Sequence, residues 1–225
     1  IENILSEDNV SLFEEYYKNT TIFEEKTSKE LLSFLRWLNS NKRYNIFKFL
    51  LLNDIKIKNV IFSNSQEFYI YSIEMQDIEV IDIISNNCHK INSNLSDKIL
   101  EVSFYQGNYE IFTFVYEKLL LNPHNLTNLS RSIQIMKTYI YSNDNSKNDI
   151  FIYLINREFP YFQHFQEELV EKFYTLQDLS TISLIVNKLK TTNVVYEYLL
   201  LKYQKEPNEN LLKILMNKKI FNFQK

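Results

Sequence analysis

The residues best suited to metal binding are few and scattered. The chain has three histidines, His89, His124 and His164, and one cysteine, Cys88, which lies directly before His89. A structural zinc site takes about four ligands at short paired spacings, and this arrangement does not supply them. We therefore expect no metal and no cofactor, and we interpret the histidines as linker residues exposed to water.

Adjacent acidic residues are the next candidates for chemistry. Neighbouring residues on a helix point in different directions, so such pairs are expected on solvated faces rather than as a general acid and base. One glycine, Gly107, cannot build a glycine-rich phosphate loop. The sequence thus predicts no catalytic residue and no enzyme. The acidic pairs are Glu14 with Glu15, Glu24 with Glu25, and Glu167 with Glu168.

Composition limits the class of protein and of partner. Of 225 residues, 45% are hydrophobic and 24% charged, which predicts a globular chain with a sizeable core. A net charge of −3 gives no electrostatic reason to bind nucleic acid. The longest apolar runs, such as residues 47–52, are too short to span a bilayer, so membrane insertion is not expected.

Two further features concern location and chain ends. A single cysteine cannot form an internal disulfide, which favours the cytoplasm or another reducing intracellular compartment. The first residue is Ile1 rather than Met, so we expect that some N-terminal residues are missing.

The elements of the chain are clearest around its only glycine. Gly107 is followed by an amphipathic run that places Ile111, Phe112, Val115 and Leu119 on one face. A lone glycine within a helical pattern indicates a turn that needs a positive φ. This stretch therefore predicts a helix, a tight turn and a second helix.

The same run recurs seven times along the chain. Its starts lie about 33 residues apart on average, a period typical of stacked helical repeats. The runs begin at Val10, Tyr44, Ile78, Tyr109, Asn148, Leu179 and Glu209. The fourth residue of each run is large and apolar and is expected in the core: Phe13, Phe47, Ile81, Phe112, Phe151, Ile182 and Leu212.

Another helical segment is predicted before each run. In three units, at residues 68–73, 99–104 and 169–174, this first segment begins ten residues before the run. Longer first segments are predicted at residues 31–41, 133–145 and 194–206. The predicted two-residue connections are Gln76-Asp77, Gly107-Asn108 and Gln177-Asp178.

Helix starts and linkers complete this organisation. Thr27 to Glu30 has the form of a capping box, and Asn64 to Glu67 resembles one. Polar linkers are expected between units, and we expect no domain boundary, so that residues 1–225 form one continuous array. The predicted linkers are residues 53–64, 85–94, 122–128 and 157–163.

The segment Gly107-Asn108-Tyr109-Glu110 resembles the start of the second helix of an ankyrin repeat. In that resemblance Ser72 and Ser103 take the small-residue position of the first helix. The whole chain is similar to the degenerate ankyrin-like arrays of AT-rich eukaryotes and large viruses. The resemblance implies an α-solenoid of six to seven helix-turn-helix repeats. Tetratricopeptide repeats share nearly the same period and stay an alternative, although the short connections favour the ankyrin-like interpretation.

The predicted architecture suggests a mode of action. A solenoid leaves a long face free, which suits a non-enzymatic scaffold that binds a protein partner or holds a position in a larger assembly. An RNA-binding helical-repeat protein and an enzyme or enzyme-associated regulatory subunit are the alternatives. A continuous Lys/Arg stripe would favour the RNA-binding protein. A converging polar pocket whose titratable groups have shifted pKa values would favour the enzyme.

The shared register of three units predicts where a partner binds. Tyr69, Leu100 and Val170 are expected to face the core together with Ser72, Ser103 and Phe173. The residues that end each first helix then project onto the face opposite the second helices, where they either bind a partner or pack against a neighbouring first segment. These predicted protein-binding residues, named below as the row, are Tyr71, Glu74, Met75, Val102, Tyr105, Gln106, Lys172 and Thr175.

Overall fold

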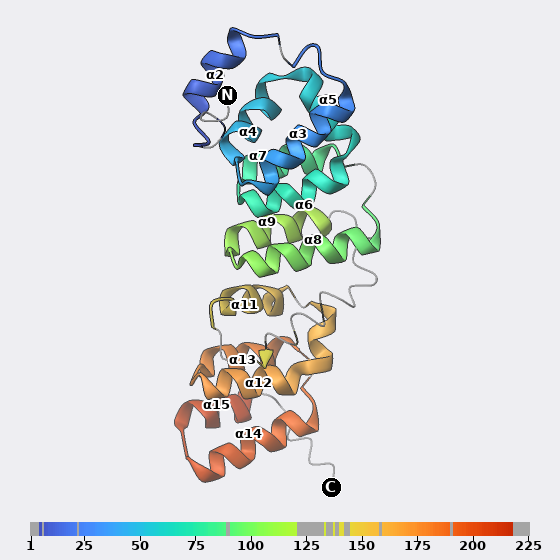
Figure 1. Cartoon of the computed structure of the whole chain (residues 1–225). Helices are drawn as coiled ribbons and strands as arrows, with labels where there is room; N and C mark the ends of the chain where they lie inside the picture. The colour runs from blue at the N-terminus through green and yellow to red at the C-terminus, as the bar shows by residue number, and fades with distance from the viewer. Residues whose placement is uncertain are drawn as a thin grey trace. The chain divides into compact units, whose positions relative to one another are not determined.

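A computed structural model of the chain (Figure 1) describes residues 5, 7–21, 23–88, 91–120, 133, 137, 140–141, 145–157, 159–189 and 191–217. The chain divides into two compact units, Ile1–Leu129 and Ser130–Lys225, named here the first and second units. The described residues form helices and no strand, so the predicted all-α class is confirmed.

The first unit holds eight of the described helices. In chain order they are α2 (Val10–Lys18), α3 (Ser28–Ser40), α4 (Tyr44–Asn53), α5 (Ile55–Ser63), α6 (Ser65–Met75), α7 (Ile78–Asn86), α8 (Ser93–Gln106) and α9 (Tyr109–Leu120). Figure 1 shows the pair α6 and α7 as one layer of this unit and the pair α8 and α9 as the next.

The second unit repeats this plan among its described residues. It contains α11 (Asn148–Asn156), the 3₁₀ helix η2 (Pro160–Phe165), α12 (Gln166–Thr175), α13 (Leu179–Lys188), α14 (Asn193–Lys205) and α15 (Glu209–Asn217). The pair α12 and α13 precedes the pair α14 and α15 (Figure 1).

All seven repeated runs are helices that begin at the predicted residues, as α2, α4, α7, α9, α11, α13 and α15. The fourth residue of six of these helices is buried: Phe13, Phe47, Ile81, Phe112, Phe151 and Ile182. In α15 the prediction is wrong, because Leu212 is half-buried and Leu211 is buried instead. Leu211, Ile214 and Leu215 share one helical face through their i, i+3, i+4 spacing.

The linker predicted at residues 53–64 is wrong, because α5 occupies most of it. The Asp54 carboxylate caps this helix by accepting the N–H of Ile57 at 2.9 Å. Ile57, Val60 and Ile61 are buried along one face, again at i, i+3, i+4 spacing. The stabilisation gained by burying this apolar face outweighs the polar character of the residues that lie between the buried ones.

A second predicted linker, residues 157–163, overlaps the start of η2 and is also not purely polar. The rings of Phe159, Phe162 and Phe165 are buried there, with centroids 5.4 and 5.1 Å apart in successive pairs. These rings join the core of the second unit, where Phe162 also lies 5.8 Å from Phe151. The linker at 122–128 and most of the first segment at 133–145 lie outside the described residues.

Of the two predicted capping boxes, one is present. Thr27 and Glu30 exchange the reciprocal hydrogen bonds of a capping box at the start of α3. The second is wrong, since the Asn64 side chain makes no capping bond to α6. Its amide donates instead to the carbonyl of Val60 at 2.8 Å, and Glu67 binds Arg36.

The extensive helix contacts in both units join elements that are close in sequence. In the first unit α3 packs on α4, α6 on α7 and α8 on α9, and these layers are joined by α2 on α4, α5 on α6, α6 on α8 and α7 on α9. In the second unit α12 packs on α13 and α14 on α15, while α11 and α15 both pack on α13 and α12 packs on α14. Among the helices of the described residues, none combines the length and apolar character that crossing a bilayer requires.

Candidate protein-binding surface

Three tight turns position the predicted surface. Gln76, Gly107 and Gln177 follow α6, α8 and α12 and adopt φ of 55°, 68° and 58°, so the positive φ predicted for Gly107 is confirmed. The next residue in each turn, Asp77, Asn108 or Asp178, caps the following helix with its side chain. All three turns therefore combine a left-handed residue with an Asn or Asp cap.

In the first unit, successive turns are hydrogen-bonded to each other. The Gln76 amide donates to Gln106 Oε1 at 3.1 Å, and Asn108 Nδ2 donates to Gln76 Oε1 at 3.2 Å. The side chain of Gln76 thus uses both its donor and its acceptor to bridge the α6–α7 turn to the α8–α9 turn.

Lys48 of α4, in the preceding layer, also binds the α6–α7 turn. Its ammonium lies 2.6 Å from Asp77 Oδ2 and 2.8 Å from a Glu79 oxygen. Partial burial disfavours the charged form of Asp77, but hydrogen bonds from Lys48 and from backbone N–H groups outweigh it and lower the pKa of Asp77. The α6–α7 turn is therefore held from both neighbouring layers.

The predicted core register of the three units is confirmed. Tyr69, Leu100 and Val170 are fully buried, as are Ser72, Ser103 and Phe173. The hydroxyls of Ser72 and Ser103 donate to the carbonyls of Tyr69 and Leu100, at 2.7 and 3.0 Å. These local bonds satisfy the buried hydroxyls without a partner from another helix.

The part of the row in the first unit forms a ridge of graded exposure. Tyr105 is the most open residue, with 59% of its surface exposed. The other five are half-buried: Tyr71, Glu74, Met75, Val102 and Gln106. Because α6 packs on α8, the two parts of this ridge lie on adjacent helices.

Tyr71 belongs to a contact between layers. Its ring meets Phe68 edge-on at 5.7 Å, and its hydroxyl donates to Glu67. Arg36 of α3 binds the same carboxylate through two bonds of 2.8 and 2.7 Å. Burial, followed by the bond to Glu67, raises the pKa of Tyr71. Tyr71 is therefore linked to the neighbouring first helix α3 only through Glu67, which Arg36 also binds.

The row residues of the second unit differ from each other. Thr175 is exposed, as expected. Lys172 is buried, with 8% of its surface exposed, so its predicted projection onto an open face is wrong. It lies three residues after the buried Leu169, on the same side of α12, where its long apolar stem is covered.

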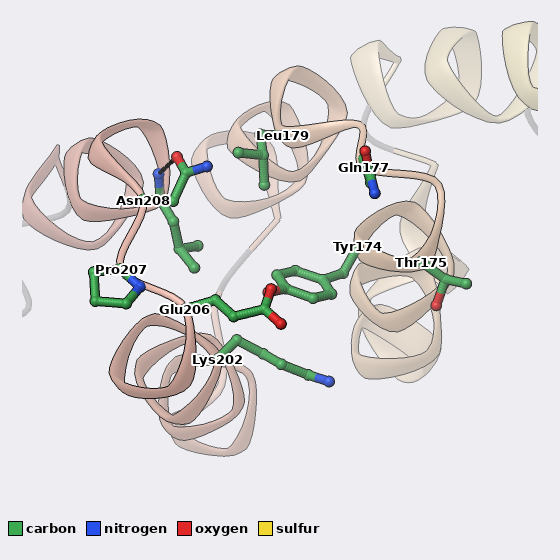
Figure 2. Close-up of a pocket in the computed structure, with 9 residues that line it drawn as sticks. Tyr174, Thr175, Gln177, Leu179, Lys202, Glu206, Pro207 and Asn208 are labelled. Atoms are coloured by element: carbon green, nitrogen blue, oxygen red, sulfur yellow. Dashed lines mark hydrogen bonds between the residues drawn. The ribbon is translucent and has the colours of Figure 1, made fainter.

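A pocket of about 600 Å³ opens where α12–α13 and α14–α15 make successive turns. We name it the inter-turn pocket, and its polar lining residues are Tyr174, Thr175, Gln177, Lys202, Glu206 and Asn208. Figure 2 shows Tyr174 of α12 close to Lys202 of α14 and to Glu206, which directly follows α14. The Lys202 ammonium lies 5.0 Å from the centre of the Tyr174 ring and 5.2 Å from that of Tyr198.

Sequence reasoning missed one exposed aromatic feature. Trp37 is 42% exposed and stacks on Phe34 with centroids 6.3 Å apart and ring planes at 9°. A pocket of about 540 Å³ lined by Leu5, Phe23 and Phe34 lies beside it. The signal was present in the sequence, because Trp37 stands three residues after Phe34 on one face of α3.

The candidate chemical residues do not converge. His164 is exposed in η2, and His89 and His124 lie outside the described residues. Within the described part of the chain, no three His, Cys, Asp or Glu side chains form a group that could hold a metal ion. Glu14 pairs with Lys18 at 2.6 Å, while its neighbour Glu15 is exposed.

Comparisons of the chain with family models, with curated proteins and with solved structures each find no match.

Proposed function

We propose that the chain is a non-enzymatic interaction scaffold, built of ankyrin-like stacked helix pairs, that binds a protein partner or holds a place in a larger assembly. The connections are short, with two residues between α6 and α7 and between α8 and α9 and three residues between α12 and α13, which supports the ankyrin-like form over the tetratricopeptide form. A stack of this kind stabilises each layer by its neighbours and leaves one face available for binding.

The observation that carries this proposal is the spacing of the hydrogen bonds between layers. Asp8 accepts the N–H of Asn45, 37 residues away, and Arg36 binds Glu67, 31 residues away. Gln76 binds Gln106 at a separation of 30 residues. In each case the partner lies about one repeat further along the chain, as nearest-neighbour stacking requires.

Lys56 of α5 makes another bond of the same range. Its ammonium donates to the carbonyls of Glu24 and Lys26 at 2.8 and 2.6 Å, across 32 and 30 residues. This bond fixes the segment between α2 and α3 to the layer that follows. The added helix α5 thus takes part in the same neighbour contacts.

A protein partner fits the surface better than nucleic acid. Several lysines between layers are neutralised by carboxylates, among them Lys48 by Asp77 and Lys118 by Asp82 at 2.6 Å each. Together with the net charge of −3, this pairing leaves little basic field to attract phosphates. Tyr105 offers the exposed aromatic contact that is enriched in protein interfaces.

The six row residues of the first unit therefore remain our proposed contact surface, and Tyr105 is the most exposed of them. Glu74, Met75 and Val102 supply the half-buried rim around it, and Gln106 is held by the bridge to Gln76. Burial, followed by the charge of Glu74, raises the pKa of Tyr44.

Quantitative affinity capture tests the proposal. Immobilised wild-type chain, Tyr105→Ala and the double variant Tyr71→Ala with Tyr105→Ala are exposed to native material, and the captured proteins are identified by mass spectrometry. We expect a specific protein whose affinity falls about tenfold with Tyr105→Ala and about thirtyfold with the double variant.

The matched control is Tyr141→Ala, which removes a tyrosine that is 63% exposed in the second unit. It should leave capture unchanged. Equal capture by wild type and by both row variants, with unchanged helicity, would show that the row is not the contact surface.

A further inference from the structure

The inter-turn pocket of the second unit lies where the first unit has a closed contact. Gln177 occupies the same place in its turn as Gln76, with the same left-handed backbone and the same following Asp. Gln76 bridges to the next turn by two hydrogen bonds, but the Gln177 carboxamide makes none with the described residues and is exposed. A donor and an acceptor are therefore left open on the pocket wall.

The facing turn also presents free polar groups. The Asn208 side-chain oxygen caps α15 by accepting the N–H of Asn210 at 2.9 Å, which leaves its amide available as a donor. Glu206 is exposed at the end of α14 and has no ion pair with the described lysines. Across the pocket, two carboxamides and one carboxylate thus offer the donors and acceptors that a peptide backbone requires.

Lys202 adds a fixed positive charge. It lies one helical turn before Glu206, yet its ammonium lies over the rings of Tyr174 and Tyr198 rather than against a carboxylate of the described residues. These two rings meet edge-on at 6.1 Å, which braces the site. An ammonium over aromatic faces keeps its charge available for an incoming anion.

We propose that the inter-turn pocket binds an extended peptide segment of the partner that carries an acidic side chain. The peptide carboxylate pairs with Lys202, the Gln177 carboxamide bonds to the peptide backbone, and Glu206 accepts a backbone N–H. Apolar groups of Leu179, Pro207 and Leu211 cover the remaining wall. The volume of about 600 Å³ suits a few residues of a peptide.

This proposal rests on the proposed function, because it assigns part of the partner to a particular site. Thr175, a row residue of the second unit, also lines the pocket. The site is separate from Tyr105, which lies in the first unit.

A phage-displayed library of random peptides, selected on the full chain, provides the probe. We expect the selected peptides to be enriched in Asp and Glu. Synthetic copies are then titrated against variants by fluorescence anisotropy. Gln177→Gly should weaken binding at least about fivefold while the chain stays at least as stable, because glycine is favoured at a left-handed position. Lys202→Met should weaken binding by a similar factor.

Lys205→Met is the matched control, since it removes the same charge from the same helix outside the pocket. It should change the affinity less than twofold. A selection that yields no acidic peptides, or peptides that bind wild type, Gln177→Gly and Lys202→Met equally, would overturn the proposal. If peptide binding is instead lost with Tyr105→Ala, the pocket proposal fails while the proposed function stands.

Discussion

The α6–α7 and α12–α13 turns have the same local design but different contacts with the next layer. Each has a left-handed glutamine, Gln76 or Gln177, followed by an aspartate that caps the second helix. In the first unit the glutamine is bridged to Gln106 and Asn108, whereas in the second unit the inter-turn pocket separates it from the next turn. The same turn therefore serves as a closed joint in one unit and as the wall of an open site in the other.

The two turns differ in what the next helix pair presents to them. After α8 the chain turns within two residues, and Gln106 and Asn108 lie within reach of Gln76. After α14 the connection runs through Glu206, Pro207 and Asn208, and Pro207 brings no donor. A longer, proline-containing connection thus leaves Gln177 without a partner among the described residues.

The largest effect is expected at the glycine of the closed joint. Gly107→Val places a β-branched residue at φ 68°, which should lower the free energy of unfolding of the first unit by about 2 kcal/mol. Urea unfolding followed by circular dichroism measures the change. Gly107→Asn should lose less than half as much, because asparagine tolerates this backbone conformation. Equal losses for both variants would mean that side-chain size, not backbone strain, is responsible.

A paired substitution compares the two joints directly. Gln177→Gly should raise the free energy of unfolding of its unit by about 1 kcal/mol, since it relieves a left-handed residue and breaks no bond to the described residues. Gln76→Gly gains the same backbone relief but loses two hydrogen bonds, so its net effect should be near zero. Thermal unfolding of both variants gives the difference. Equal stabilisation at the two positions would show that the bridge contributes nothing.

A smaller effect on the free energy of unfolding is expected from removing the Lys48 charge, which binds the α6–α7 turn. Lys48→Met should cost about 0.5 to 1 kcal/mol at neutral pH, because the ion pair is only partly buried. Asp77 has a lowered pKa, so its contribution is present above its ordinary pKa and is lost as pH falls through the folded value. The variant should therefore raise the pKa of Asp77 and reduce the acid sensitivity of the first unit.

Carboxyl carbon shifts in an NMR titration measure this pKa. Asp178 is the internal control, because burial raises its pKa but hydrogen bonds from Ser180 and Thr181 of its own helix outweigh that effect and lower it. Its titration should not change in the Lys48→Met chain. An unchanged Asp77 titration would contradict the assigned role of Lys48.

The parts of the fold that depend on local signals could be predicted from the sequence. The seven runs, the positive φ of Gly107 and the capping box at Thr27 are each encoded within a few neighbouring residues. Helix α5 was missed because Lys56, Lys58 and Asn59 obscure its apolar face, although the buried spacing was present.

Features that depend on other layers were beyond a local interpretation. Lys172 is buried although its register predicted an open position, and the Asn64–Glu67 box fails because Arg36 takes the Glu67 carboxylate. Tyr71 and Tyr105 share the same register in their helices, so the sequence could not show that Tyr105 is exposed while Tyr71 is half-buried. The inter-turn pocket could not be predicted from the sequence, because no local pattern shows that Gln177 lacks the hydrogen bonds to the next turn that Gln76 makes.

Hydrogen exchange in a destabilised first unit tests the stacked architecture most directly. Phe13 of α2 is fully buried and packs against Phe23 and Phe49, with ring centroids 6.2 and 5.9 Å apart. In Phe13→Ala, neighbour-only packing predicts that α2 loses most amide protection, α4 loses part of it, and α8 and α9 keep theirs. Equal loss of protection in α2, α4, α8 and α9 would instead show a single cooperative globule and contradict the stack of helix pairs on which the proposed scaffold function depends.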